Sequence, residues 1–233
     1  MFGIGTLEYN IVSFRNWVHF LCTGGDYESK KYFVIGHPRT GTKSIHHVLE
    51  ENNIASLHSP GMWPTKEFDA FSDRGYYQPI KSFVQRYPNS LYLLNTRSCV
   101  GFIRSWMIHK QVKSATLTES MVRDQIIRRN QFFIEMVKLV PASGNDLIIF
   151  DIQKPGAFSW LCRRLDFNDV DVASKREKRP ELSVENAKIL TKVFDDLGIE
   201  NAEENFVLSE ITSSEDMGQV QRFLDEHKND VYI

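Results

Sequence analysis

Four short runs of almost continuous apolar residues recur along the chain. They cover residues 32–36, 54–58, 91–96 and 146–151. Runs of this length, without strict alternation of polar and apolar positions, are typical of strands buried on both faces of a parallel sheet. Because helical patterns separate the runs, the sequence predicts an α/β fold with a mostly parallel central sheet flanked by helices.

Helical periodicity is clearest in residues 116–140. Thr116 and Glu119 have the spacing of a capping box, which predicts where this helix begins. We therefore expect a long amphipathic helix that lies on the sheet through one apolar face. The apolar residues that define the face recur every three or four positions: Val122, Ile126, Phe133, Val137 and Val140.

Three further helices are predicted in the second half of the chain. One follows Pro155, one covers residues 183–197 with Gly198 as a C-terminal stop, and one lies in the tail. The charged segment 166–180 is only weakly periodic and is interpreted as a loop within a domain. We therefore expect a single domain over residues 1–233.

Composition narrows the classes of function. The chain has 233 residues with 42% hydrophobic content, which is enough to bury a full core. Its 28 Lys and Arg residues against 30 Asp and Glu residues give a net charge of -2. The chain therefore has no global basic field that would indicate binding to nucleic acid or to an anionic membrane surface. Any anion site must be local.

Cysteine usage and the N-terminal segment indicate a reducing compartment. Cys22, Cys99 and Cys162 are too few and too widely spaced for a disulfide framework or a zinc site. The apolar stretch near the N-terminus is short and contains Arg15 and His19, so it predicts neither a membrane span nor a signal peptide. We expect a soluble, cytoplasmic protein.

Residues 32–50, YFVIGHPRTGTKSIHHVLE, run from a predicted strand through a turn into a helix. Such a turn aims backbone N–H groups and the positive end of the helix dipole at one point, which is the geometry of a phosphate or sulfate cradle. The turn is therefore predicted to hold an anion. It contains two glycines and several cationic or hydroxyl side chains: Gly36, Gly41, Arg39, Thr40, Thr42, Lys43 and Ser44.

A nucleotide kinase or ATPase is one interpretation of this turn. In the pattern of those enzymes the Lys directly follows the second Gly, whereas Thr42 separates Gly41 from Lys43 here. One extra residue rotates a helix position by about 100 degrees, so Lys43 is not expected to point toward a phosphate. Asp151 ends a predicted strand as a magnesium-holding carboxylate would, although Asp is also common there as a turn former.

The segment PRTGT at residues 38–42 resembles the 5'-phosphosulfate loop of the sulfotransferases that use 3'-phosphoadenosine 5'-phosphosulfate (PAPS). A second segment, LLNTRSCVGFIRSW, resembles the 3'-phosphate motif of this family, with Arg97 after a strand and Ser105 eight residues later. The resemblance is to the bacterial-type branch and covers roughly residues 32–165. It implies a P-loop-like three-layer sandwich, in which residues 166–233 form a helical C-terminal part of the same domain.

The resemblance also implies a reaction. A sulfuryl group would pass from PAPS to a hydroxyl or amine of a small-molecule or glycan acceptor, leaving adenosine 3',5'-bisphosphate (PAP). Arg39 stands where the family has its catalytic Lys or Arg, and Lys43 stands where the family usually has a second Thr. We expect Arg39 and the loop amides to stabilise charge on the oxygen that bridges to the leaving phosphate, with Lys43 as a further cation and no metal.

A base must remove the proton of the acceptor. Asp73 lies about where relatives have this base along the chain, and it is slightly favoured over His58, whose ordinary pKa suits proton abstraction near neutrality. The basic segment 175–179 is predicted either to close over the 3'-phosphate or to be a solvated loop. Candidates for the acceptor pocket, with the aromatic residues equally plausible as core, are Trp63, Tyr76, Tyr77, Trp106 and the helix at 116–140. A catalytically inactive nucleotide-binding module is the third interpretation, and the oligomeric state is left open.

Overall fold

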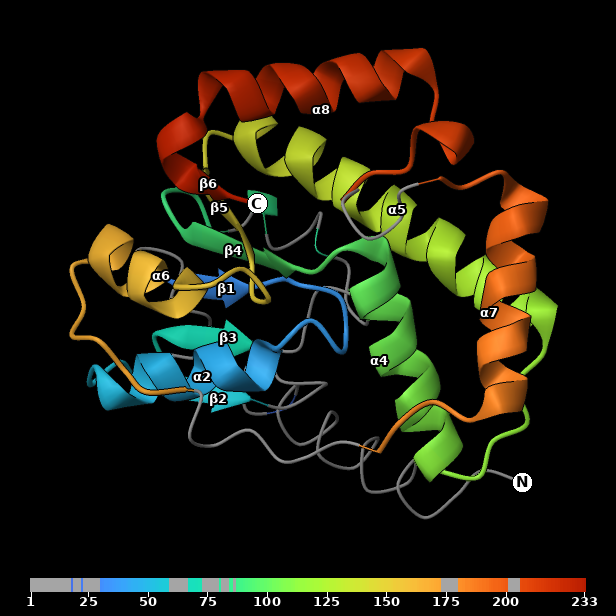
Figure 1. The fold of residues 1–233 in the computed structure, drawn as a ribbon. Helices are drawn as coiled ribbons and strands as arrows, with labels where there is room; N and C mark the ends of the chain where they lie inside the picture. The colour runs from blue at the N-terminus through green and yellow to red at the C-terminus, as the bar shows by residue number, and fades with distance from the viewer. Residues whose placement is uncertain are drawn as a thin grey trace.

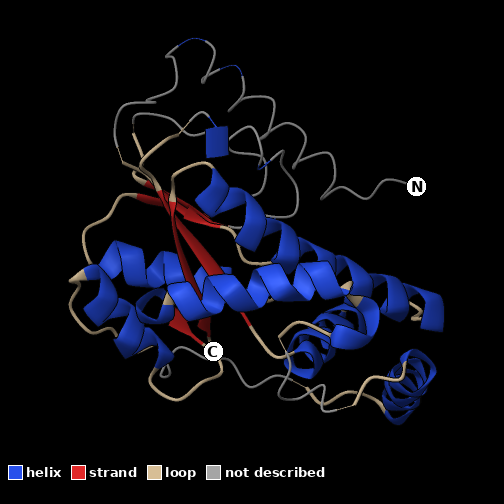
Figure 2. Cartoon of the chain, turned by 90° about the horizontal axis from the view of Figure 1, so that it is seen from above, coloured by secondary structure: helices blue, strands red, loops and turns tan. Residues whose placement is uncertain are grey.

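A computed structural model describes residues 18, 22, 30–58, 67–72, 80, 84–85, 87–172, 180–200 and 206–233. They form a six-stranded sheet in the order β2-β3-β1-β4-β5-β6, and every pair of neighbouring strands is parallel. Helices lie on both sides of the sheet (Figures 1 and 2). The predicted α/β class is confirmed, in a three-layer arrangement consistent with a P-loop-like fold.

The bounds of the elements are as follows. The strands are β1 (Tyr32–Val34), β2 (Ser56–His58), β3 (Ala70–Ser72), β4 (Leu91–Thr96), β5 (Asp146–Asp151) and β6 (Val231–Tyr232). The α-helices are α2 (Thr42–Glu51), α4 (Cys99–Val112), α5 (Glu119–Ala142), α6 (Ala157–Leu165), α7 (Val184–Leu197) and α8 (Ser214–Glu226). Short 3₁₀ turns, η2 (Ser209–Ile211) and η3 (Lys228–Asp230), precede α8 and β6.

The sheet is buried on both faces because successive side chains of each strand point to opposite sides. In β4, Tyr92 and Leu94 pack in one apolar cluster with α5 and α8, while Leu91 and Leu93 pack in another with α2 and α6. Figure 1 shows α5 and α8 on one side of the sheet and α2 and α6 on the other. A third cluster joins α4, α5 and α7.

The strand order places a topological switch between β1 and β4. The chain leaves β1 through α2 toward β2 on one side, and it leaves β4 through α4 and α5 toward β5 on the other. Because parallel crossovers are right-handed, the two directions put α2 and α5 on opposite faces of the sheet. In open α/β sheets such a switch leaves a crevice at the carboxyl ends of the two strands, where ligands bind.

Several predicted boundaries differ from the structure. The side chain of Thr118 caps α5 by accepting from the Met121 N–H (3.3 Å), so the predicted capping box of Thr116 and Glu119 is wrong. A capping box needs Glu at the third helical position, whereas Glu119 is the first residue of α5. For α7, Ser183 is the N-cap and Gly198 ends the helix with φ 64°, as predicted.

Strands β3 and β6 were not predicted. They contain three and two residues, too few for a periodic signal in the sequence. Because β6 lies after residue 165, the C-terminal part is not purely helical. No helix in the described ranges is long and apolar enough to cross a bilayer. The three cysteines are free thiols, with Cys99 and Cys162 buried and Cys22 exposed.

Candidate functional site

The loop between β1 and α2 is a tight turn closed by its own residues. Thr40 donates to the carbonyl of His37 through its backbone N–H (3.1 Å) and its Oγ1 hydroxyl (2.5 Å). Pro38 and Arg39 form the centre of the turn, and Arg39 has φ 78°. Glycine or asparagine usually takes this position in type II turns, so Arg39 bears strain of about 1 to 2 kcal/mol. Strain of this kind concentrates at functional sites.

Gly41 begins α2 in the left-handed region, with φ 90°. The described first turn of α2 has neither a side-chain cap nor an acidic residue, so no side chain of the turn competes with an anion for the positive end of the dipole. A Cβ on Gly41 would lie 2.6 Å from Cδ1 of Ile152, which directly follows β5. Glycine therefore lets the loop pack closely against the end of β5.

The three residues after Gly41 have different environments. Thr42 is buried, and Ser44 donates its backbone N–H to the Gly41 carbonyl (2.9 Å). Lys43 is exposed. Burial is the main cause that lowers the pKa of His46 and of His58, and the charge of Lys43 adds to it. The Lys43 charge therefore acts on one histidine of α2 and on the last residue of β2.

Asn95 of β4 joins the loop after β1 to the end of β4. Its Oδ1 accepts from the Gly36 N–H (3.1 Å), and its Nδ2 donates to the carbonyl (2.7 Å) and to Oγ1 (2.9 Å) of Thr40. A Cβ on Gly36 would lie 2.2 Å from Asn95 Oδ1, so glycine is required for this approach. The structure thus brings the turn of Arg39 beside the strand end that precedes Arg97.

Arg97 and Ser105 line one pocket of about 300 Å³ beside the first turns of α4. Ser98 caps α4 by accepting from the Gly101 N–H (3.2 Å). A Cβ on Gly101 would lie 1.9 Å from Gln153 Oε1, so this glycine lets the Gln153 side chain lie against the helix. The pocket has two cationic and no acidic side chains among its described lining residues, which are Arg97, Ser98, Val100, Gly101, Arg104, Ser105, Ile108 and Gln153.

Asp151 has the geometry of a turn former. Its Oδ1 accepts from the Gln153 N–H (2.9 Å), and β4 separates its strand from β1. Burial raises the pKa of Asp151, while this N–H and the charge of Arg97 oppose the shift. Within the described residues, no cluster of three or more His, Cys, Asp or Glu side chains could hold a metal ion. These contacts support the turn interpretation of Asp151.

His58, the last residue of β2, is held by β3. Its Nδ1 lies 2.6 Å from Oγ of Ser72, and that hydroxyl also donates to the Leu57 carbonyl (3.4 Å). When Nδ1 carries the proton and donates to this hydroxyl, Nε2 of the neutral ring can take a proton. Burial, followed by the charges of His46 and Lys43, lowers the pKa of His58 to about 4.

His58 also stacks on His46 of α2, with ring centroids 5.4 Å apart. Asp73, the favoured base, lies outside the described residues, as do the basic segment 175–179 and the acceptor-pocket candidates Trp63, Tyr76 and Tyr77. Trp106 is partly buried in the cluster of α4, α5 and α7, and its ring centroid is 5.7 Å from the Lys110 ammonium group. This packing supports the core interpretation of Trp106.

Sequence reasoning missed Asn95, Ser72 and Arg129. Asn95 interrupts an otherwise apolar strand, which is the signal that could have identified it. Arg129 occupies the gap between Ile126 and Phe133 in the apolar stripe of α5, where helical spacing places a buried residue. In the structure Arg129 is buried and donates to the Arg97 carbonyl (2.7 Å).

Comparisons of the chain with family models, with curated proteins and with solved structures found no match. The sulfotransferase motifs stay a resemblance in short segments. Inferences about function therefore depend on the residues gathered at the carboxyl ends of β1, β4 and β5.

Proposed function

We propose that the protein transfers a sulfuryl group from PAPS to a hydroxyl or amine acceptor. The observation that carries the proposal is the set of hydrogen bonds from Asn95 to Gly36 and Thr40, which holds the Arg39 turn beside the strand that leads to Arg97. PAPS has a sulfated 5'-phosphate and a separate 3'-phosphate on one ribose. An enzyme that uses it needs two neighbouring anion sites.

Each of the two sites has suitable donors. Arg39 and the uncapped N-terminus of α2 would hold the sulfated 5'-phosphate. Arg97 and Ser105, which line one pocket, would hold the 3'-phosphate through charge-assisted hydrogen bonds. A nucleoside triphosphate has no 3'-phosphate, so the second site favours PAPS over ATP.

Sulfuryl transfer resembles phosphoryl transfer in its loose, in-line displacement. The bond between sulfur and the bridging phosphate oxygen breaks as the acceptor oxygen or nitrogen bonds to sulfur, and negative charge develops on the bridging oxygen. Arg39 and the loop N–H groups would stabilise that charge. PAP leaves with the electron pair, and the proton of the acceptor passes to a base.

His58 is the base that the contacts of the described residues favour. In the tautomer that donates from Nδ1 to Ser72, Nε2 would accept the proton of the acceptor. Burial lowers the pKa of His58 to about 4, so its ring is neutral at pH 7. Strand β3 separates β2 from β1, so the two strands are about 10 Å apart, and the acceptor would lie between the base and the loop. Asp73 is the alternative base, and separate substitution of the two residues distinguishes them.

Thermal unfolding with two ligands tests the proposal. PAP without a metal is expected to raise the melting temperature, because a ligand at 100 times its Kd adds about 2.7 kcal/mol to the free energy of unfolding. ATP with magnesium is expected to have a smaller effect. Stabilisation by ATP and magnesium alone would overturn the transferase and favour a kinase or ATPase.

Turnover separates an enzyme from an inactive binding module. Labelled PAPS is incubated with acceptor extracts, and transfer of label to a hydroxyl or amine compound is expected. Binding of PAP without transfer to any fraction would favour the inactive module. Loss of transfer in His58→Asn, with Asp73→Asn still active, would support His58 as the base.

A further inference from the structure

Arg129 of α5 is buried beneath the carboxyl end of the sheet, with 2% of its surface exposed. Its Nη2 donates to the carbonyl of Arg97 (2.7 Å) and to Oγ1 of Thr96 (3.1 Å). Its Nη1 donates to the carbonyl of Phe206. The guanidinium group therefore contacts the strand end that carries Arg97.

A buried arginine of this kind is unusual. Arginine is almost never fully buried unless it is paired, because an ion loses its hydration in the interior. In the described part of the chain, the hydrogen-bond acceptors of Arg129 are one hydroxyl and two carbonyls, and no carboxylate lies within ion-pair distance. These dipoles only partly offset the positive charge.

The charge of Arg129 acts on groups at three neighbouring strand ends. Burial is the largest cause of the shifted pKa values of His37 after β1, Cys99 after β4 and Asp151 in β5, and the charge of Arg129 contributes to each. A second residue of α5, Gln125, has its Nε2 3.3 Å from Nε2 of His37. Helix α5 therefore contacts both loops of the proposed donor site from one side.

We propose that Arg129 is a positioning residue for anion binding at Arg97. It fixes the peptide group of Arg97, whose carbonyl also accepts from Oγ1 of Thr96 (3.3 Å), so that the Arg97 side chain lines the pocket. A bound anion in turn adds negative charge near Arg129, whose charge interacts with the Asp151 carboxylate without forming an ion pair. The identity of the anion as a nucleotide phosphate depends on the proposed function, whereas the positioning does not.

Calorimetric titration of the full-length protein tests this inference with two probes, inorganic sulfate and PAP. Below the melting temperature of each variant, Arg129→Gln is expected to weaken both affinities about tenfold, which corresponds to about 1.4 kcal/mol. Arg129→Lys keeps the charge and is expected to bind with intermediate affinity. Arg123→Gln is the matched control, since Arg123 lies on the same helix and pairs with Asp196 at the surface (3.1 Å).

A purely structural role for Arg129 would lower the melting temperature of the variants and leave both affinities of the folded protein unchanged, and this result overturns the proposal. Thr96→Val removes one acceptor of Arg129 with little change of shape, and it serves if Arg129→Gln does not fold. It is expected to weaken binding about threefold, and unchanged affinity would again overturn the proposal.

The two probes separate this inference from the proposed function. If the unmodified protein binds sulfate but not PAP, the transferase proposal fails, and the sulfate affinities of the variants still decide the role of Arg129. If it binds neither probe, both proposals fail. If the unmodified protein binds sulfate and PAP, and the Arg129 variants bind them more weakly while Arg123→Gln does not, the proposed function and the role of Arg129 are both supported.

Discussion

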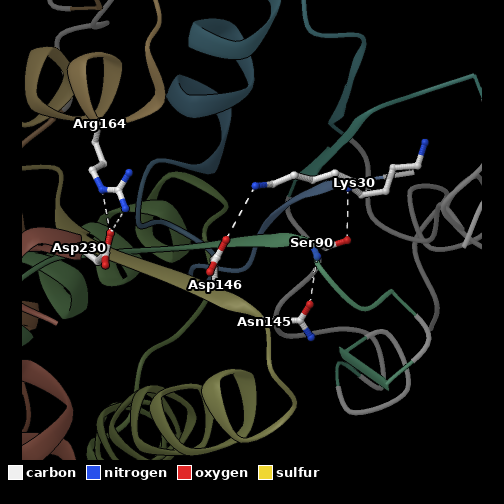
Figure 3. Close-up of polar contacts among 7 residues, drawn as sticks. Lys30, Ser90, Asn145, Asp146, Arg164 and Asp230 are labelled. Carbon is white, nitrogen blue, oxygen red and sulfur yellow. Dashed lines mark hydrogen bonds and ion pairs between the residues drawn. The ribbon is translucent and has the colours of Figure 1, made fainter. Parts of the chain in front are cut away.

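The two ends of the sheet each have a pocket, and their charges are arranged differently. At the amino ends of the strands a pocket of about 270 Å³ has cationic and acidic side chains side by side. Lys30 lies 3.8 Å from Asp146, and Arg164 pairs with Asp230 (Figure 3). The protein thus balances the charges of this pocket internally.

At the carboxyl ends, the pocket of about 300 Å³ has Arg97 and Arg104 but no acidic residue among its described lining residues. The neighbouring turn holds Arg39 at φ 78°, and a buried Arg129 lies beneath. Two pockets of nearly equal size therefore differ in what they can bind. The charges of the amino-end pocket are paired with one another, whereas the carboxyl-end pocket suits an anion from outside.

Substitution of one arginine at each end gives the largest expected contrast. Arg39→Met is expected to lower turnover about 100- to 1000-fold, because one donor to the developing charge is lost. Arg164→Met removes an arginine from the amino-end pocket and is expected to leave turnover unchanged. Steady-state kinetics with PAPS and an active acceptor measure both. Equal losses of turnover in the two variants would contradict a functional difference between the two ends of the sheet.

The base gives the next largest effect. His58→Asn is expected to lower kcat about 100-fold, the usual contribution of a general base. Because burial lowers the pKa of His58 to about 4, the neutral ring persists down to that pH, and kcat/KM is expected to fall only as the pH drops through about 4. A pH–rate profile with an acid limb near 6.5 would contradict this environment for His58.

Two glycine substitutions compare the close packing at the crevice with an open helix surface. Gly36→Ala places a Cβ 2.4 Å from the Asn95 carbonyl oxygen and is expected to cost about 3 kcal/mol of unfolding free energy. Gly218→Ala, in α8, meets no atom within 4 Å and is expected to add about 0.5 to 1 kcal/mol. Urea denaturation measures both, and a neutral Gly36→Ala would show that the loop does not need Asn95 so close.

A pH scan of stability gives a smaller effect at the same end. Burial lowers the pKa of His37 to about 4 against an ordinary 6.5, so the unfolded chain binds more protons between these values. Stability is therefore lost as the pH falls below 6.5, by about 2 kcal/mol at pH 5 from this group. His37→Phe is expected to reduce that dependence. If the free energy of unfolding of His37→Phe changes with pH as steeply as that of the unmodified protein, groups other than His37 cause the pH dependence.

Much of the fold follows from local patterns. The runs at 91–96 and 146–151 match β4 and β5, because buried parallel strands are continuously apolar. Strand β3 was missed because its three residues are recognisable only beside β1 and β2. The C-terminal β6 is shorter still and forms through its pairing with β5.

The site was predictable where its residues are adjacent in the chain. The turn of Arg39 and the strand end before Arg97 can each be recognised in the sequence. That the two segments lie in contact cannot. Asn95 reaches Thr40 across 55 positions, and Arg129 reaches Arg97 across 32, so only the tertiary structure reveals these links. The positive φ of Arg39 was also unpredictable, since the same residues can form a turn without it.

The affinity difference between PAP and adenosine 5'-phosphate tests the central claim most directly, because the two ligands differ only in the 3'-phosphate. If both strand ends hold one nucleotide, PAP is expected to bind about 10- to 100-fold more tightly, as a charge-assisted hydrogen bond would give. Arg97→Ala should abolish this difference, and Arg164→Ala should preserve it. Equal affinities in the unmodified protein, or an unchanged difference in Arg97→Ala, would contradict the shared site.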